Sequence, residues 1–149
     1  MAVFVINEWL WADLSGSNGR QAQREAFSVI EKLPASDHLI VVIEGSSFDR
    51  KAWKLCKSTN PMIVQRIAGA YVANVRQNSD RCLIVKPETA VALPGELASA
   101  TNIDDHYLVQ AQLSVSGAVL VTTDEHLREA VGNAGLLCLS REEFLNTYF

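Results

Sequence analysis

The chain has 149 residues, with 17 acidic and 13 basic side chains and a formal net charge of −4. Hydrophobic residues make up 48% and charged residues 20%, which is typical of a globular domain and not of a disordered chain. This length predicts a single domain over residues 1–149, large enough to fold without disulfide or metal staples. Taken as an average, the negative charge argues against a protein that coats nucleic acid.

The charge is unevenly distributed along the chain. Residues 20–86 carry eleven bases and six acids, whereas residues 87–149 carry two bases and nine acids. Between residues 50 and 86, eight basic side chains stand against one acid, Asp80. This split predicts a basic surface beside an acidic one, and such a basic surface suits a phosphate backbone.

Cysteine spacing and hydropathy indicate the compartment. The three cysteines are far apart and form no CxxC pair, so neither a disulfide framework nor a zinc site is predicted, and reduced thiols in the cytoplasm are expected. No cationic segment precedes the first apolar run, and the longest aliphatic run is Leu39–Ile43. We therefore expect no signal peptide and no membrane span.

Short apolar runs alternate with longer amphipathic segments along the chain. The apolar runs predict strands at Ala2–Ile6, Leu39–Ile43, Cys82–Val85, Val119–Thr122 and Leu136–Leu139. The other segments predict helices at Arg20–Lys32, from Ser46 or Ser47 to about Ser58, from Pro61 to about Asn78, near Gly95, from Asn102 to about Ser114, and at Glu125–Asn133. This alternation predicts an α/β fold, a three-layer α/β/α sandwich on a parallel sheet.

Oxygen-bearing side chains follow several of the predicted strands, where open α/β sheets bind their ligands. They are Asn7, Glu8, Glu44 and Asp124, together with Asp104 and Asp105 at the start of a predicted helix. Clustered carboxylates repel one another unless a cation neutralises them, and oxygen ligands favour Mg²⁺ or Mn²⁺. Such a cation can polarise a phosphate oxygen and lower the pKa of a water, which suits phosphodiester hydrolysis.

Each acid also has a plain structural interpretation. Asp104 and Asp105 can cap a helix, Asp124 can be the N-cap of the helix at Glu125, and Glu44 can be a turn residue. No GxSxG, GxxxxGK[ST] or GxGxxG motif offers a competing chemistry. The three histidines have no evident catalytic partner in register.

Three segments resemble the PIN-domain family. One is Ile103-Asp-Asp-His-Tyr-Leu-Val-Gln-Ala111, followed by Gly117-Ala-Val-Leu-Val-Thr-Thr-Asp124. It is similar to the family's acidic helix start and the strand end that follows it. The opening Val3-Phe-Val-Ile-Asn7-Glu8 resembles the family's first strand, and Glu44 after an apolar run is the third match.

The resemblance implies a fold, an activity and partners. It implies an α/β/α sandwich in which three or four acids bind Mg²⁺ or Mn²⁺ and cleave single-stranded RNA. It also implies a possible role as the toxin of a toxin–antitoxin pair, with an antitoxin protein as partner, and a possible homodimer.

Carried over residue by residue, the resemblance assigns metal ligation to Asp104 or Asp105 and to Asp124, with Glu44 assisting. Asp104 is favoured over Asp105, which a regular helix would turn about 100° away. The first-strand position holds Asn7 where the family normally has aspartate. Asn7 offers a carbonyl oxygen without charge, and Glu8 offers charge from the next position.

Basic side chains in the middle of the chain give the proposed substrate a place to bind. Lys51 and Lys54, at i and i+3, and Arg50 are expected to bind flanking phosphates. Trp53 lies among them and either stacks on a base or is buried under the sheet, burial being the commoner fate of tryptophan.

Two other functions remain open at this stage. One is a catalytically silent PIN-like module that binds RNA or protein, with Asn7 as the mark of a decayed site. The other is a Rossmann-like domain for a small ligand. Asn7-Glu8 fit the acidic pair of a phospho-acceptor domain poorly.

Overall fold

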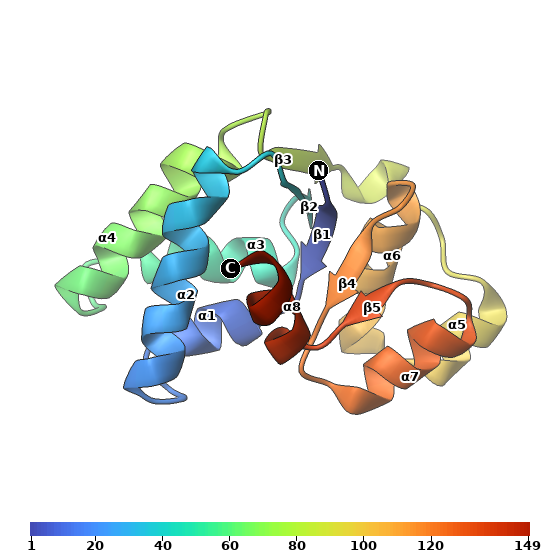
Figure 1. Cartoon of the computed structure of the whole chain (residues 1–149). Helices are drawn as coiled ribbons and strands as arrows, with labels where there is room; N and C mark the ends of the chain where they lie inside the picture. Colours follow the sequence, from blue (N-terminus) through green and yellow to red (C-terminus); the bar gives the residue numbers. More distant parts are fainter.

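The computed structural model describes all residues from Met1 to Phe149. Five strands form one parallel sheet in the order β3-β2-β1-β4-β5. The strands are β1 (Val3–Ile6), β2 (Leu39–Ile43), β3 (Cys82–Val85), β4 (Val119–Val121) and β5 (Cys138–Leu139). β1 lies at the centre, which places the residues that follow it in the middle of the carboxyl edge of the sheet (Figure 1).

Eight α-helices alternate with these strands and cover both faces of the sheet (Figure 1). They are α1 (Trp9–Leu14), α2 (Arg20–Lys32), α3 (Ser47–Leu55), α4 (Met62–Tyr71), α5 (Gly95–Ala100), α6 (His106–Ser114), α7 (Glu125–Asn133) and α8 (Arg141–Tyr148). The predicted α/β fold on a parallel sheet is therefore confirmed. None of these helices has the length and apolarity needed to cross a membrane.

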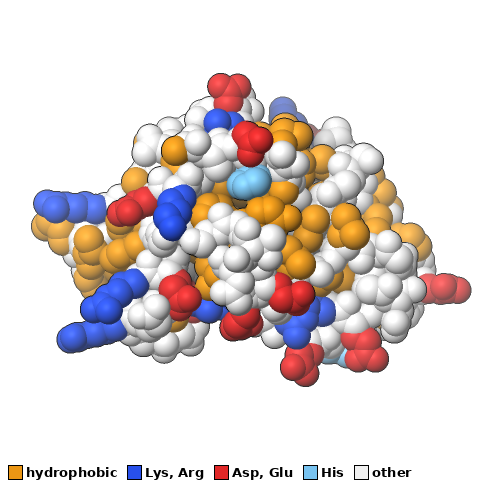
Figure 2. Space-filling model, viewed as in Figure 1, with side chains coloured by type: hydrophobic (Ala, Val, Ile, Leu, Met, Phe, Trp, Pro, Cys, Tyr) orange, Lys and Arg blue, Asp and Glu red, His pale blue; other side chains and the backbone are white.

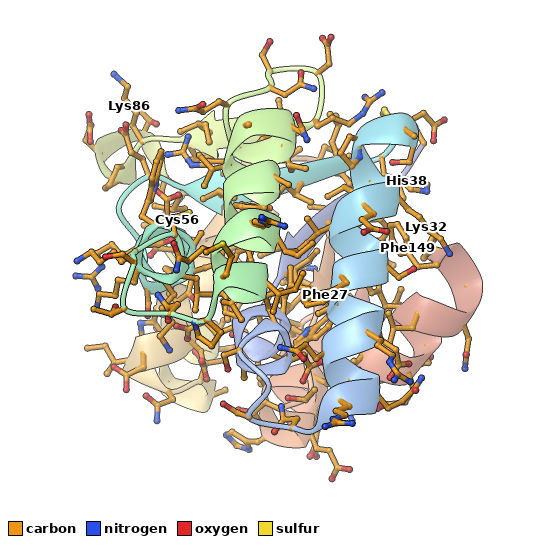
Figure 3. The ribbon with its side chains drawn as sticks, turned by 90° about the vertical axis from the view of Figure 1, so that its left-hand side faces the viewer. Phe27, Lys32, His38, Cys56, Lys86 and Phe149 are labelled. Carbon is orange, nitrogen blue, oxygen red and sulfur yellow. The ribbon has the colours of Figure 1, made fainter.

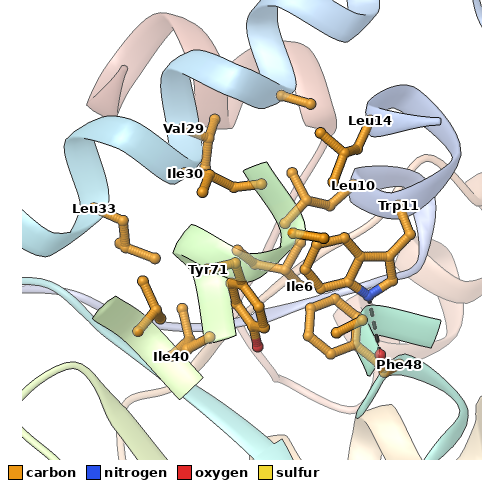
Figure 4. Close-up of a cluster of buried hydrophobic side chains, with 14 of the residues drawn as sticks. Ile6, Leu10, Trp11, Leu14, Val29, Ile30, Leu33, Ile40, Phe48 and Tyr71 are labelled. Carbon is orange, nitrogen blue, oxygen red and sulfur yellow. Dashed lines mark hydrogen bonds between the residues drawn. The ribbon is translucent and has the colours of Figure 1, made fainter. Parts of the chain in front are cut away.

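Two hydrophobic cores pack on opposite faces of the sheet. Along β1, Phe4 and Ile6 enter one core and Val5 enters the other, as the two-residue period of a strand requires. The larger core joins the sheet to α1, α2, α3, α4 and α8, and the smaller joins it to α5, α6 and α7. In the larger core the Trp11 indole N–H donates to the Phe48 carbonyl at 3.0 Å, which ties α1 to α3 (Figure 4).

The two ends of the chain contribute helices that the sequence did not predict. α1 begins directly after Asn7 and Glu8, and both of its tryptophans, Trp9 and Trp11, are buried. α8 begins with a capping box between Ser140 and Glu143 and ends beside α2. There the Lys32 ammonium donates to the Phe149 carbonyl at 3.1 Å (Figure 3).

Several predicted boundaries differ from the structure. The helix predicted from Pro61 to about Asn78 is α4 followed by a π-helical segment, Val72–Arg76. The last strand is two residues long, shorter than the predicted Leu136–Leu139. The helix predicted from Asn102 begins instead as a 3-10 turn, Ile103–Asp105, before α6. This last difference changes the direction of the acidic side chains in the site.

Candidate functional site

A cleft of about 960 Å³ opens at the carboxyl ends of β1 and β4. Its floor includes Asn7 and Glu8 after β1 and Thr123 after β4, and Asp105 reaches it from the turn before α6. Lys51 and Lys54 of α3 also line the cleft, together with residues of α1, α2 and α8. In the view of Figure 2, acidic and basic side chains lie side by side along the lower edge of the molecule.

Asn7 is fixed between β1 and β4. Its Nδ2 donates to Thr122 Oγ1 at 2.8 Å, and its Oδ1 accepts from the Glu8 amide at 2.7 Å. Its own backbone N–H donates to the Val121 carbonyl at 3.0 Å. Thr122 is completely buried. The Asn7 side chain therefore holds the β1 end against the β4 end, and both of its polar atoms have partners within the protein.

Glu8 is held by two donors from α3. Its Oε1 accepts from Ser47 Oγ at 2.6 Å and from the Lys51 ammonium at 2.8 Å. Partial burial would raise the pKa of Glu8, but the bonds from Lys51 and Ser47 outweigh it and the pKa lies below its usual value. Glu8 is therefore an ionised carboxylate at neutral pH, already paired with a cation of the protein.

Asp105 lies in a different environment. It lines the cleft, and its carboxylate accepts no hydrogen bond and joins no ion pair. Burial, and then the charges of Asp124, Asp104 and Glu8, raise its pKa above the ordinary value. The pKa of the neighbouring Tyr107 phenol is also raised, by burial and by the charges of Glu8 and Asp105. Negative charge is thus concentrated around Asp105 without a bonded counter-charge.

The remaining predicted acids lie outside the cleft wall. Asp104 is exposed and Glu44 is exposed in the turn after β2. Asp124 Oδ1 accepts from the Leu127 amide at 3.1 Å, so this carboxylate caps α7, as its plain structural interpretation expects. The preference for Asp104 assumed a regular helix from Asn102. Because residues 103–105 form a 3-10 turn, Asp105 is the member of the pair that reaches the cleft.

The structure brings together Asn7, Glu8 and Asp105, but it places no group of three His, Cys, Asp or Glu side chains where they could hold one metal ion. The predicted cluster of Asp104, Asp124 and Glu44 is therefore not assembled. The donor chemistry nevertheless fits Mg²⁺ or Mn²⁺, which need only one or two carboxylates and keep several waters. Asp105 is the carboxylate that is free to bind, and Asn7 and Glu8 lie beside it in the same cleft.

Two of the four predicted RNA-binding residues line the cleft. Lys51 and Lys54 lie on the same face of α3, as their i, i+3 spacing predicts. Arg50 is exposed and Trp53 is 43% exposed, and neither lines the cleft. Trp53 is therefore not buried under the sheet, contrary to the commoner expectation. Its exposed ring leaves base stacking open outside the cleft.

The cleft lining also holds a charged group that sequence reasoning missed. Arg141 of α8 donates to Asp13 at 2.7 Å and to Glu25 at 3.2 Å, and its guanidinium lies 5.5 Å from the centre of the Trp9 ring. Asp13 is almost fully buried and also accepts from Asn18 at 2.7 Å. No local signal pairs residues 128 positions apart. The capping-box spacing at Ser140 could have predicted α8 itself.

His106, which adjoins the acidic pair, turns away from the cleft. Its Nε2 lies 3.1 Å from the Ala98 carbonyl and 3.3 Å from the Thr101 carbonyl, so the ring joins α6 to α5. This is a structural role, and we assign no chemistry to the ring.

The fold and the cleft define an α/β protein with a polar site at the carboxyl edge of a five-stranded parallel sheet. Comparison with protein-family models, with curated proteins and with solved structures found no match.

Proposed function

We propose that this chain is a metal-dependent endoribonuclease that hydrolyses phosphodiester bonds of single-stranded RNA in the cleft at Asp105. The observation that carries the proposal is the free Asp105 carboxylate, surrounded by negative charge and facing the cleft that Lys51 and Lys54 line. A divalent cation suits the negative charge around Asp105, and the polyanionic backbone of RNA suits the two lysines. The PIN-like motifs around Asp105 and Asp124 favour the same activity.

The residues of the cleft have distinct roles in this proposal. Asp105 holds the cation, and the Asn7 carbonyl oxygen and Glu8 are further donors that line the same cleft. Lys51 and Lys54 bind the phosphates on either side of the bond that is cleaved. The contact from Asn7 to Thr122 keeps the ends of β1 and β4 in register beneath the substrate. A bound Mg²⁺ or Mn²⁺ would supply a Lewis acid for the phosphate and lower the pKa of a nearby water.

The test is cleavage of an unstructured RNA by the purified chain with Mn²⁺ or Mg²⁺. We expect cleavage that stops on addition of EDTA and that is lost in Asp105→Asn, a near-isosteric change that removes the negative charge. Asp104→Asn should retain most of the activity, because Asp104 is exposed and does not line the cleft. Equal cleavage by the parent chain and Asp105→Asn would show that the site is wrong or that the activity is a contaminant.

A second candidate function is a catalytically silent module that binds RNA without cleaving it. The observation that favours it is that neither Asn7 nor Glu8 offers a free negative charge to a metal ion. Asn7 is uncharged, Glu8 is paired with Lys51, and the other acids that line the cleft are paired with Arg141, so the cleft lining offers no second carboxylate without a partner. Calorimetry separates the two functions. A silent module would bind RNA in EDTA and show no heat with millimolar Mn²⁺, whereas the nuclease would bind Mn²⁺.

The resemblance also suggests an antitoxin partner and a homodimer, and both remain proposals. A toxin role has a simple genomic test, which is whether a short open reading frame of antitoxin type lies immediately beside the gene.

A further inference from the structure

Lys51 and Glu8 form an ion pair in the cleft. The Lys51 ammonium lies 2.8 Å from Glu8 Oε1, and Ser47 Oγ lies 2.6 Å from the same oxygen. Ser47 and Lys51 are one turn apart on α3, so the helix directs two donors at one carboxylate. The Lys51 side chain is half exposed and the Glu8 side chain is 27% exposed, so solvent and a ligand can reach both.

Apart from Glu8, the cleft lining offers a divalent cation few carboxylates without a partner, so the state of Glu8 matters for metal binding. The other polar side chain after β1, Asn7, carries no charge, and Asp105 supplies one carboxylate. Asp124, Asp104 and Glu8 all act on Asp105 through their charges, and of these three only Glu8 also lines the cleft, so we take Glu8 as the second carboxylate for a divalent cation. An ammonium bonded to Glu8 competes for the same oxygen, because both cations need its lone pairs and repel each other.

We infer that Lys51 is a built-in cation of this cleft, which neutralises Glu8 and competes with a divalent cation for it. This inference rests on the proposed function, since it takes the cleft as a site for Mg²⁺ or Mn²⁺. It adds that the divalent cation binds weakly while Lys51 remains on Glu8.

Lys51 couples the binding of RNA to the binding of the divalent cation. Lys51 is also one of the two lysines expected to bind phosphate, and a phosphate bound to its ammonium weakens the attraction between that ammonium and Glu8. An RNA phosphate that draws Lys51 away frees Glu8 for the metal ion. RNA and the divalent cation then strengthen each other's binding, and by linkage the factor is the same in both directions.

The test is a calorimetric titration of Mn²⁺ into the intact chain in the absence of RNA. Lys51→Met keeps most of the side-chain length and removes the ammonium, and we expect it to bind Mn²⁺ about tenfold tighter than the parent. Lys54→Met is the matched control, because it removes the same charge from the same helix face without releasing a bonded carboxylate. It should change the affinity by less than about threefold. The double variant Glu8→Gln with Lys51→Met should lose the gain.

The outcomes separate this inference from the proposed function. The inference is overturned if Lys51→Met binds Mn²⁺ no tighter than the parent, if Lys54→Met gains as much, or if the gain survives Glu8→Gln. Circular dichroism confirms that each variant is folded. RNA cleavage by the parent chain is scored in parallel. If the parent chain does not cleave RNA and only Lys51→Met binds Mn²⁺ more tightly, the nuclease proposal is contradicted and the inferred role of Lys51 is supported.

Discussion

At the scale of single residues, Asp105 couples the site to the stability of the fold. Burial and the neighbouring acids raise its pKa above the usual 3.8, so the folded state disfavours the ionised carboxylate. An acid of this kind destabilises the fold at pH values above its folded pKa. The penalty disappears when the pH falls below the ordinary pKa, because the carboxylate is then protonated in both the folded and the unfolded chain.

We therefore predict that Asp105→Asn raises the free energy of unfolding at pH 7 and that the gain shrinks toward about pH 4. Urea unfolding in metal-free buffer at several pH values measures both effects. Glu88→Gln, a change at an exposed acid outside the cleft, should stay within about 0.5 kcal/mol. A destabilised Asp105→Asn, or a gain independent of pH, would mean that the environment of Asp105 is not the one described.

The acidic pair also shows where sequence reasoning reaches its limit. The strand and motif patterns singled out residues 104 and 105, and the preference between the two depended on helix geometry. A 3-10 turn replaces the regular helix there, and Asp105 in place of Asp104 lines the cleft. The contact between Glu8 and Lys51 joins residues 43 positions apart, and no local pattern predicts it.

At the scale of elements, a buried ion pair positions α3 and hence Lys51. Arg76 donates to both carboxylate oxygens of Asp49, at 2.6 and 3.0 Å, and the Gly45 amide donates to Asp49 at 2.9 Å. Gly45 has φ +74°, which a residue with a side chain rarely adopts, and this lets the chain turn from β2 into α3.

We predict that Arg76→Ala destabilises the protein by about 3–5 kcal/mol, because it leaves the buried Asp49 carboxylate without its partner. Arg66→Ala removes an exposed arginine from α4 and should cost less than about 0.5 kcal/mol. Chemical denaturation of the two variants side by side measures the difference. Similar, small losses in both would contradict a structural role for the Arg76 to Asp49 contact.

The C-terminal helix is the second element that shapes the cleft. Phe144 of α8 is fully buried, with its ring centre 4.9 Å from that of Phe4 on β1, and Arg141 at the start of α8 forms part of the cleft wall. Phe144→Ala should lower the free energy of unfolding by about 3–5 kcal/mol, through lost burial and the cavity left behind.

Leu137→Ala is the control for this change, since Leu137 is 57% exposed and its truncation opens no cavity. Thermal and urea unfolding of both variants give the comparison. A loss in Phe144→Ala no larger than that in Leu137→Ala would show that α8 does not pack against the sheet as described.

The elements themselves were predictable to different degrees for physical reasons. Buried parallel strands are short aliphatic runs bounded by polar residues and turns, and this pattern located all five. Helix α1 was missed because it is six residues long and directly follows the Asn7-Glu8 strand end. Helix α8 was missed although its capping box was visible in the sequence, since it follows a strand of two residues.

At the scale of the whole molecule, the uneven charge becomes a spatial arrangement. The basic stretch supplies Lys51 and Lys54 to the cleft, the acidic stretch supplies Asp105 to the same cleft, and Glu8 comes from the N-terminal segment. The sheet order makes this possible, because β1 lies between β2 and β4 and brings the three parts of the chain to one edge. The net charge of −4 therefore does not argue against an RNA substrate.

The central claim is that the cleft at Asp105 binds a divalent cation for work on a phosphate backbone. The most direct measurement is a crystal structure of the chain grown with Mn²⁺, in which anomalous scattering locates the metal. We predict a Mn²⁺ peak in the cleft, bonded to the Asp105 carboxylate and absent from crystals of Asp105→Asn. A cleft without a peak at millimolar Mn²⁺, or metal bound away from Asp105, would contradict it.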